Sequence, residues 1–160
     1  MSFSVAVVTV SDRVSRGEAE DGSGPALVRL LEESGYEVAG TGLVPDDRHA
    51  ITLELGKWVA RGVALLLTTG GTGFSPRDVT PEATSDVVER RADGLAELMR
   101  REGSRQTTMA ALSRGIAGIS GTTLVINVPG SVKGATESLT ALLEVLPHAL
   151  RTAAGDADHH

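Results

Sequence analysis

The chain has 160 residues, a length that suits one domain with a normal core. Hydrophobic residues make up 41% and charged residues 22%, as in soluble globular proteins, and with only 2% aromatics the core must be built from Val, Leu, Ile and Ala. The absence of cysteine excludes disulfides, thiolate metal sites and cysteine nucleophiles, and the net charge of -6 disfavours general nucleic-acid binding, which needs a basic surface.

The first third of the chain alternates between strand and helix patterns. Residues 3–10 read as a buried strand, and residues 24–34 carry an apolar helical face that ends at a glycine. A second strand is predicted for residues 36–44. Asp46 and Asp47 then start a helix that runs to about residue 61, because aspartate caps the free N–H groups of a first turn well.

The alternation continues to the C-terminus. Residues 63–68 are apolar on both faces, which is typical of a strand inside a parallel sheet covered by helices on both sides. The later elements are predicted as helices at 81–91 and 94–102, a short helical piece at 109–112, strands at 116–119 and 123–128, and a helix at 132–154. Because Pro147 lies inside the last helix, it should kink the helix or split it in two.

This order of elements predicts a three-layer α/β/α sandwich with a mainly parallel central sheet. We expect a single domain over residues 1–155 and a disordered tail over residues 156–160. Ligands in such folds bind beyond the carboxyl ends of the strands. The loops expected to meet at that edge are those that follow Val10, Val44, Thr68 and Val128.

A glycine-rich loop follows the strand at residues 63–68. Gly70, Gly71, Thr72 and Gly73 allow the backbone to come close to a ligand, and a strand-to-helix turn of this kind directs N–H groups at an anion. Thr80 is expected to cap the next helix, with Pro81 at its first position. The spacing excludes a P-loop and a dinucleotide fingerprint. A tight turn that needs glycines only for steric reasons remains an alternative.

Arg77 and Asp78 complete this loop. An acid beside a phosphate-binding loop is explained if it holds Mg²⁺, which prefers oxygen ligands. The alternative for Asp78 is an ion pair with Arg77. The alternative for Asp46 is a plain helix N-cap, and Asp47 is expected to be a cap and not a ligand.

The string TTGGTGFSPRDVTPEA at residues 68–83 resembles the signature of the molybdenum cofactor biosynthesis family, and of its Mog/MoaB group with the molybdopterin adenylyltransferases in particular. The resemblance extends over nearly the whole chain. The other segments that carry it are VSDRVSRGEAEDGSG at 10–24, VPDD at 44–47, LSR at 112–114 and NVPGS at 127–131.

The resemblance implies a three-layer α/β/α fold, assembled as a homotrimer or a hexamer, and a reaction in which AMP passes from MgATP to the terminal phosphate of molybdopterin and pyrophosphate leaves. Asp46 and Asp78 would then be the catalytic residues and the ligands that place Mg²⁺ and the ATP phosphates. The alternative is a catalytically weak or inactive MoaB-type paralogue that binds molybdopterin.

Substrate contacts are also implied by the resemblance, residue by residue. They fall on Ser11, Asp12, Arg13, Gly70, Gly71, Thr72, Gly73, Arg77, Thr80, Pro81, Ser113, Arg114, Asn127, Pro129, Gly130 and Ser131. For Ser11, Asp12 and Arg13 a polar turn with a capping serine is the alternative. With no basic signal segment at the N-terminus and no apolar run of about 18 residues, we expect a cytoplasmic protein without a membrane partner.

Overall fold

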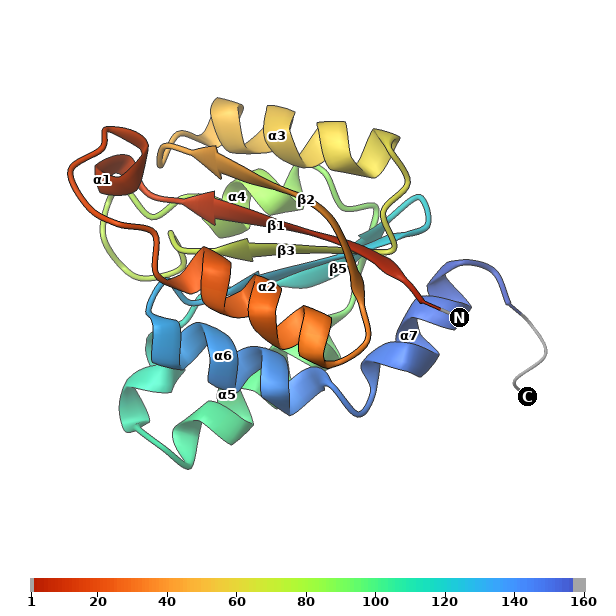
Figure 1. Ribbon diagram of the computed structural model, residues 1–160. Helices are drawn as coiled ribbons and strands as arrows, with labels where there is room; N and C mark the ends of the chain where they lie inside the picture. The colour runs from red at the N-terminus through yellow and green to blue at the C-terminus, as the bar shows by residue number, and fades with distance from the viewer. Residues whose placement is uncertain (1, 157–160) are drawn as a thin grey trace.

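The computed structural model describes residues 2–156, which form one six-stranded sheet between two layers of helices (Figure 1). The strands are β1 (Ser4–Val10), β2 (Glu37–Val44), β3 (Leu65–Thr69), β4 (Arg90–Arg91), β5 (Ala117–Ser120) and β6 (Thr123–Val128). Their order across the sheet is β2-β1-β3-β6-β5-β4. The first four strands in this order, β2, β1, β3 and β6, are parallel to one another. β5 runs antiparallel to both of its neighbours, β6 and β4. The predicted three-layer α/β/α sandwich with a mainly parallel sheet is confirmed.

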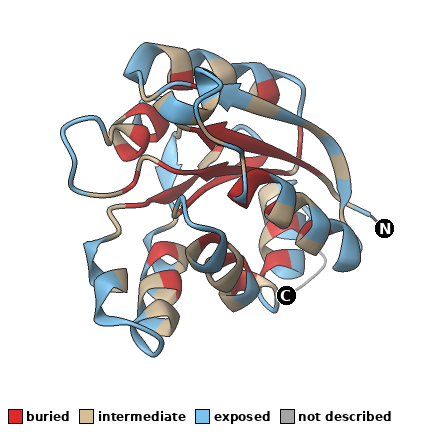
Figure 2. Cartoon of the chain, turned by 60° about the vertical axis from the view of Figure 1, so that its left-hand side comes forward, coloured by how far each residue is buried: buried red, intermediate tan, exposed pale blue. Residues whose placement is uncertain are grey.

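The helices are α1 (Asp12–Ser15), α2 (Ser23–Glu33), α3 (Arg48–Ala60), α4 (Thr80–Ser85), α5 (Asp93–Ser104), the 3₁₀ helix η1 (Thr108–Leu112), α6 (Val132–Leu142) and α7 (Leu146–Ala153). α3 and α4 pack on one face of the sheet, and α2, α5, α6 and α7 pack on the other. Figure 2 shows that the buried residues concentrate in the strands and on the helix faces turned toward them. Among residues 2–156, no helix is long and apolar enough to cross a membrane.

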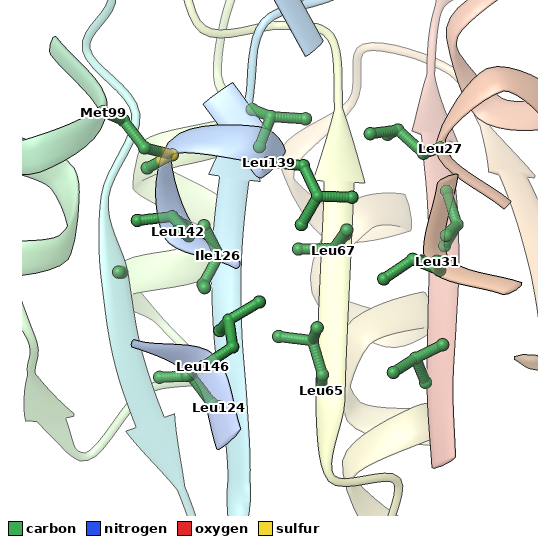
Figure 3. Packing of buried hydrophobic residues seen from close by; sticks show 14 of the residues in the cluster. Leu27, Leu31, Leu65, Leu67, Met99, Leu124, Ile126, Leu139, Leu142 and Leu146 are labelled. Atoms are coloured by element: carbon green, nitrogen blue, oxygen red, sulfur yellow. The ribbon is translucent and has the colours of Figure 1, made fainter. Parts of the chain in front are cut away.

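Strand β3 lies in the middle of the sheet, and its side chains supply both halves of the core. Leu65 and Leu67 point toward α2, α6 and α7, whereas Leu66 points toward α3, because successive side chains of a strand face opposite sides. Figure 3 shows Leu67 among leucines from these helices. All three leucines are fully buried. The core is therefore aliphatic, as the composition predicts.

One predicted helix is wrong over half its length. The sequence predicts a helix at 81–91, but α4 ends at Ser85. The chain then turns, and the N–H groups of Glu89 and Ala92 donate to the carbonyls of β5. This pairing forms β4, a strand that the sequence analysis does not predict, at the outer edge of the sheet.

Other boundaries differ less. The helix predicted at 132–154 is split into α6 and α7 with Pro147 in the first turn of the second, so the predicted break is confirmed. The short α1 is not predicted as a helix, but its capping by the Ser11 side chain agrees with the alternative given for residues 11–13. The single domain over residues 1–155 stays a prediction. The tail expected at 156–160 lies, apart from Asp156, outside the described residues.

Candidate functional site

The carboxyl ends of the parallel strands meet at one edge of the sheet, where the arrowheads of β1, β2 and β3 point toward α1 in Figure 1. The loops there are joined by backbone hydrogen bonds. The Ser11 N–H donates to the Val44 carbonyl (2.9 Å), and the Gly70 N–H donates to the Val128 carbonyl (3.2 Å). The loops predicted to converge after β1, β2, β3 and β6 therefore do so.

Asp12 and Asp46 bind each other's backbone at this edge. The Asp12 N–H donates to Asp46 Oδ2, and the Asp46 N–H donates to Asp12 Oδ1, both at 2.9 Å. Asp47, and not Asp46, is the N-cap of α3, since its Oδ2 accepts the Ala50 N–H at 2.8 Å. A plain helix cap therefore does not account for Asp46.

The carboxyl groups of Asp12 and Asp46 differ in their electrostatic surroundings. Arg77 donates through two nitrogens to the two carboxylate oxygens of Asp12, at 3.0 Å each, and so does not pair with Asp78. This contact with Arg77, followed by the hydrogen bond from the Asp46 N–H, lowers the pKa of Asp12. The pKa of Asp46 is raised, first by burial and then by the nearby negative charges of Asp12 and Asp78. Asp46 thus lies where a cation would be favoured.

The glycine loop lies directly against these carboxylates. Gly71 has φ +70°, and a Cβ there would meet the Thr80 hydroxyl and lie 2.9 Å from Asp46 Oδ1. A Cβ on Gly73 would lie 2.9 Å from Asp78 Oδ2. Only glycine at these two positions lets the acids approach the loop backbone this closely.

Thr80 holds the loop closed rather than capping a helix. Its hydroxyl donates to the Gly70 carbonyl (2.9 Å), and its N–H donates to the Gly71 carbonyl. The N-cap of α4 is Val79, without a side-chain hydrogen bond, so the prediction of Thr80 as the cap is wrong. Pro81 lies in the first turn, at the second helical position and not at the first as predicted.

Two hollows open at this edge. The larger, of about 430 Å³, lies between the glycine loop, α5, η1 and the start of α6. The smaller, of about 290 Å³, lies between the glycine loop and the segment that connects β1 to α2. Gly71, Asp78 and Gly130 line both hollows, so the two spaces meet at the loop.

The predicted site residues can be grouped by the hollow that they line. The larger is lined by Thr72, Gly73, Ser113, Asn127, Pro129 and Ser131, and the smaller by Ser11, Asp46 and Gly70. The remaining predicted residues line neither of these two hollows, namely Asp12, Arg13, Arg77, Thr80, Pro81 and Arg114. All of these substrate contacts stay predictions.

The side chain of Asn127 forms its hydrogen bonds with other groups of the protein. It is 1% exposed, and its Oδ1 accepts the Ile116 N–H at 3.1 Å. Its Nδ2 donates to the hydroxyls of Thr68 and Thr84, at 2.8 and 2.9 Å. Asn127 therefore ties β6 to β3 and α4 beneath the larger hollow.

Several polar residues of the smaller hollow are absent from the sequence prediction, among them Asp21 and Ser23. Asp21 accepts the Thr9 hydroxyl (2.7 Å) and the Gly24 N–H (3.0 Å), and the hydroxyls of Ser23 and Thr69 are hydrogen-bonded to each other (2.9 Å). Both line the smaller hollow. Their sequence signal is the pair of glycines, Gly22 and Gly24, in the loop that follows the first strand.

The chain matches the model of one protein family over most of its length. Residues 6–148 match the model of the molybdenum cofactor biosynthesis family described as a probable molybdopterin binding domain. The chain belongs to this family. This match, together with a MoaB structure and a molybdopterin adenylyltransferase among the relatives, confirms the predicted resemblance to the Mog/MoaB group.

Individual relatives have known names or structures. The chain is similar to the molybdopterin biosynthesis enzyme MoaB from Thermus thermophilus, with 52% identity, a TM-score of 0.91, and coverage of 96% of this chain and 97% of that one. It is 38% identical to the molybdopterin adenylyltransferase of Helicobacter pylori over 90% of this chain and 84% of the relative.

Longer relatives contain a segment similar to this chain. The molybdenum cofactor synthesis protein cinnamon of Drosophila melanogaster is 42% identical, with 97% of this chain covered. This chain spans only 26% of the fly protein.

Proposed function

We propose that this protein is a molybdopterin adenylyltransferase, which joins the AMP part of ATP to the terminal phosphate of molybdopterin. An oxygen of that phosphate forms a bond to the α-phosphorus of ATP, the bond from this phosphorus to the bridging oxygen breaks, and pyrophosphate leaves with the electron pair. Family membership and the similarity to the H. pylori enzyme support this choice of substrates.

The observation that carries the proposal is the meeting of two hollows at Gly71, Asp78 and Gly130. A transfer between two substrates needs both of them held with their reacting atoms in contact, because positioning supplies much of the rate. The larger hollow would take the pterin, and the smaller one the nucleotide. The reacting phosphates would then meet at the glycine loop, beside Asp46 and Asp78.

The donor set at the loop suits Mg²⁺. Within residues 2–156 no group of three or more acidic or histidine side chains could hold a metal by itself, whereas Mg²⁺ in phosphoryl-transfer sites needs only one or two carboxylates plus substrate phosphates. Asp46 Oδ1 is directed at Gly71, and burial and neighbouring acids already raise the pKa of Asp46. Asp46 and Asp78 would hold the ion, which when bound neutralises phosphate charge.

The test is an assay of purified protein with molybdopterin, ATP and Mg²⁺, scored for adenylated molybdopterin. Asp46→Asn and Asp78→Asn should each lower kcat by about 100-fold or more, because each removes a charge that places the phosphates. Asp47→Asn is the matched control, since asparagine also caps a helix and Asp47 lines neither hollow. Undiminished turnover in both site variants would contradict the catalytic assignment.

Titration calorimetry separates the proposal from a non-catalytic binding role. An adenylyltransferase should bind both ATP and molybdopterin, whereas a binding paralogue should take up molybdopterin without forming product. A homotrimeric or hexameric assembly and a cytoplasmic location stay predictions.

A further inference from the structure

Arg114 grips the glycine loop although it lines neither hollow. Its Nε donates to the Gly73 carbonyl (2.8 Å) and its Nη2 to the Asp78 carbonyl (2.7 Å). The Arg114 N–H also donates to the Thr72 carbonyl, at 2.8 Å. One residue therefore fixes the backbone at the beginning of the loop and at the acid near its end.

Glu82, in the first turn of α4, holds the other side of the guanidinium. Arg114 Nη1 donates to Glu82 Oε2 at 2.7 Å, and Nη2 donates to Oε1 at 3.3 Å. Arg114 lowers the pKa of Glu82, and Glu82 raises the pKa of Arg114, so both groups are charged at neutral pH. Four of the five N–H donors of the guanidinium are thus used inside the protein.

The segment that carries Arg114 is itself anchored to the larger hollow. Arg100 of α5 donates through Nη1 to the carbonyls of Ser113 (3.3 Å) and Gly115 (2.9 Å). Arg100, Ser113 and Gly115 all line the larger hollow. A continuous set of hydrogen bonds therefore runs from the wall of this hollow through Arg114 to the backbone of Asp78.

We propose that Arg114 is a positioning residue that acts with Glu82 to hold Asp78 at the junction of the two hollows, and that it does not bind substrate phosphate. This role rests on the proposed adenylyl transfer for its effect on turnover. A guanidinium whose donors are already used to fix a loop has little left for a ligand, whereas its planar fork is suited to holding several acceptors at once.

The variants that test this role are Arg114→Lys and Glu82→Gln. Lysine keeps the charge but has a single compact ammonium that cannot hold the acceptors in the same plane, and glutamine keeps the shape of Glu82 without its charge. Both should lower kcat by about 10- to 100-fold, since small displacements of a positioned group have effects of this size. The KM values for ATP and molybdopterin should stay within about threefold, because neither side chain lines a hollow.

Arg48→Gln is the matched control. Arg48 forms the same kind of two-point pair with Asp86 at the end of α4, at 2.8 Å for each contact, but it does not touch the glycine loop. Loss of the Arg48–Asp86 ion pair should leave kcat unchanged. A general loosening of α4 would instead lower kcat in Arg48→Gln as much as in Glu82→Gln, and that result would overturn the proposal.

Direct phosphate binding by Arg114 predicts a different pattern. Glu82→Gln would then free the guanidinium and leave kcat unchanged or lower the KM, and Arg114→Lys would retain most of the activity. Either result would overturn the positioning role.

Hydrogen exchange provides a readout that needs no turnover. Without substrates, the amides of residues 72–78 should exchange faster in Arg114→Lys and Glu82→Gln than in the wild type, and at the wild-type rate in Arg48→Gln. Unchanged exchange of these amides in both Arg114→Lys and Glu82→Gln would overturn the positioning role. Absence of transfer by the wild type, with faster exchange in the variants, would instead refute the proposed function alone.

Discussion

Gly71 shows how a single missing Cβ shapes the site. Its φ of +70° and the closeness of Asp46 and Thr80 make any side chain at this position costly. Gly17 has a similar φ of +76°, but nothing lies within 4 Å of a Cβ there. A side chain at position 17 would therefore introduce backbone strain alone, whereas a side chain at position 71 would introduce both backbone strain and a steric clash.

Gly17→Ala should lower the free energy of unfolding by about 1–2 kcal/mol, the cost of a left-handed backbone for an L-residue. Gly71→Ala should lower it by more, because its Cβ must also displace the Thr80 hydroxyl and the Asp46 carboxylate. Denaturant unfolding of both variants measures the difference. Equal losses would show that the loop accommodates a Cβ, and the steric argument for this glycine would then fail.

Single residues also show what the sequence could predict of the site. The shared edge of the sheet is predictable from topology, because Asp46, Asp78 and the glycines each lie in a loop beyond a predicted strand, whereas the catalytic role of the two acids is implied only by the family resemblance. The grip of Arg114 on Gly73, 41 positions away, could not be predicted, because it depends on how two loops pack. The hydrogen-bond partners of Asn127 cannot be predicted from the sequence for the same reason, since they come from three separate segments.

At the scale of elements, α4 shows the limit of local patterns. Val87 and Val88 continue an apolar pattern beyond Ser85, yet the chain leaves the helix and pairs with β5. The two valines lie in the turn before β4 and pack against the α3 side of the core, so tertiary packing ends the helix where the local pattern would continue it. Pro147 was a stronger signal, because proline interrupts helical hydrogen bonding wherever it lies inside a helix.

The ion pair that docks α4 predicts a pH dependence. Arg114 lowers the pKa of Glu82 from its ordinary 4.5, so the pair stabilises the fold above pH 4.5 and loses its effect as pH falls through the lowered value. Glu82→Gln should therefore cost about 1 kcal/mol at neutral pH and almost nothing in acid. Thermal unfolding of the wild type and the variant across this range measures the cost.

Glu18→Gln is the comparison for that experiment. Glu18 pairs with Arg16 on the surface, with side chains 53% and 59% exposed, and such pairs contribute little. Its effect on stability should be small at every pH. A constant difference between the wild type and Glu82→Gln from neutral to acid pH would mean that charge is not the cause.

At the scale of the whole molecule, the alternation of strands and helices was enough to predict the layers of the fold. Strand direction was not readable, because β5 and β6 are buried on both faces and such strands show the same apolar runs whether parallel or antiparallel. The tight connection between them, with Gly121 at φ +59°, makes the hairpin. The antiparallel end of the sheet thus follows from its turn rather than from its strands.

The aliphatic core predicts a large difference between two leucines. Leu67 is fully buried at the centre of the sheet, whereas Leu53 on α3 is 61% exposed. Leu67→Ala should lower the free energy of unfolding by about 3 kcal/mol, because it removes buried methyl groups and leaves a cavity. Leu53→Ala should change it by less than about 0.5 kcal/mol. Similar losses at both positions, measured by denaturant unfolding, would contradict this account of the core.

The backbone bond from Gly70 to Val128 has a consequence for the order in which the protein is made. On the ribosome, Asp46 and Asp78 emerge well before Arg114 and Val128, the residues that hold the glycine loop in place. A nascent chain halted before residue 114 carries both carboxylates but neither of these anchors. Because such contacts between distant segments form only after the chain has closed long loops, the site is completed only once residue 128 has been made. Only a chain that extends through α6 can therefore present the two hollows together.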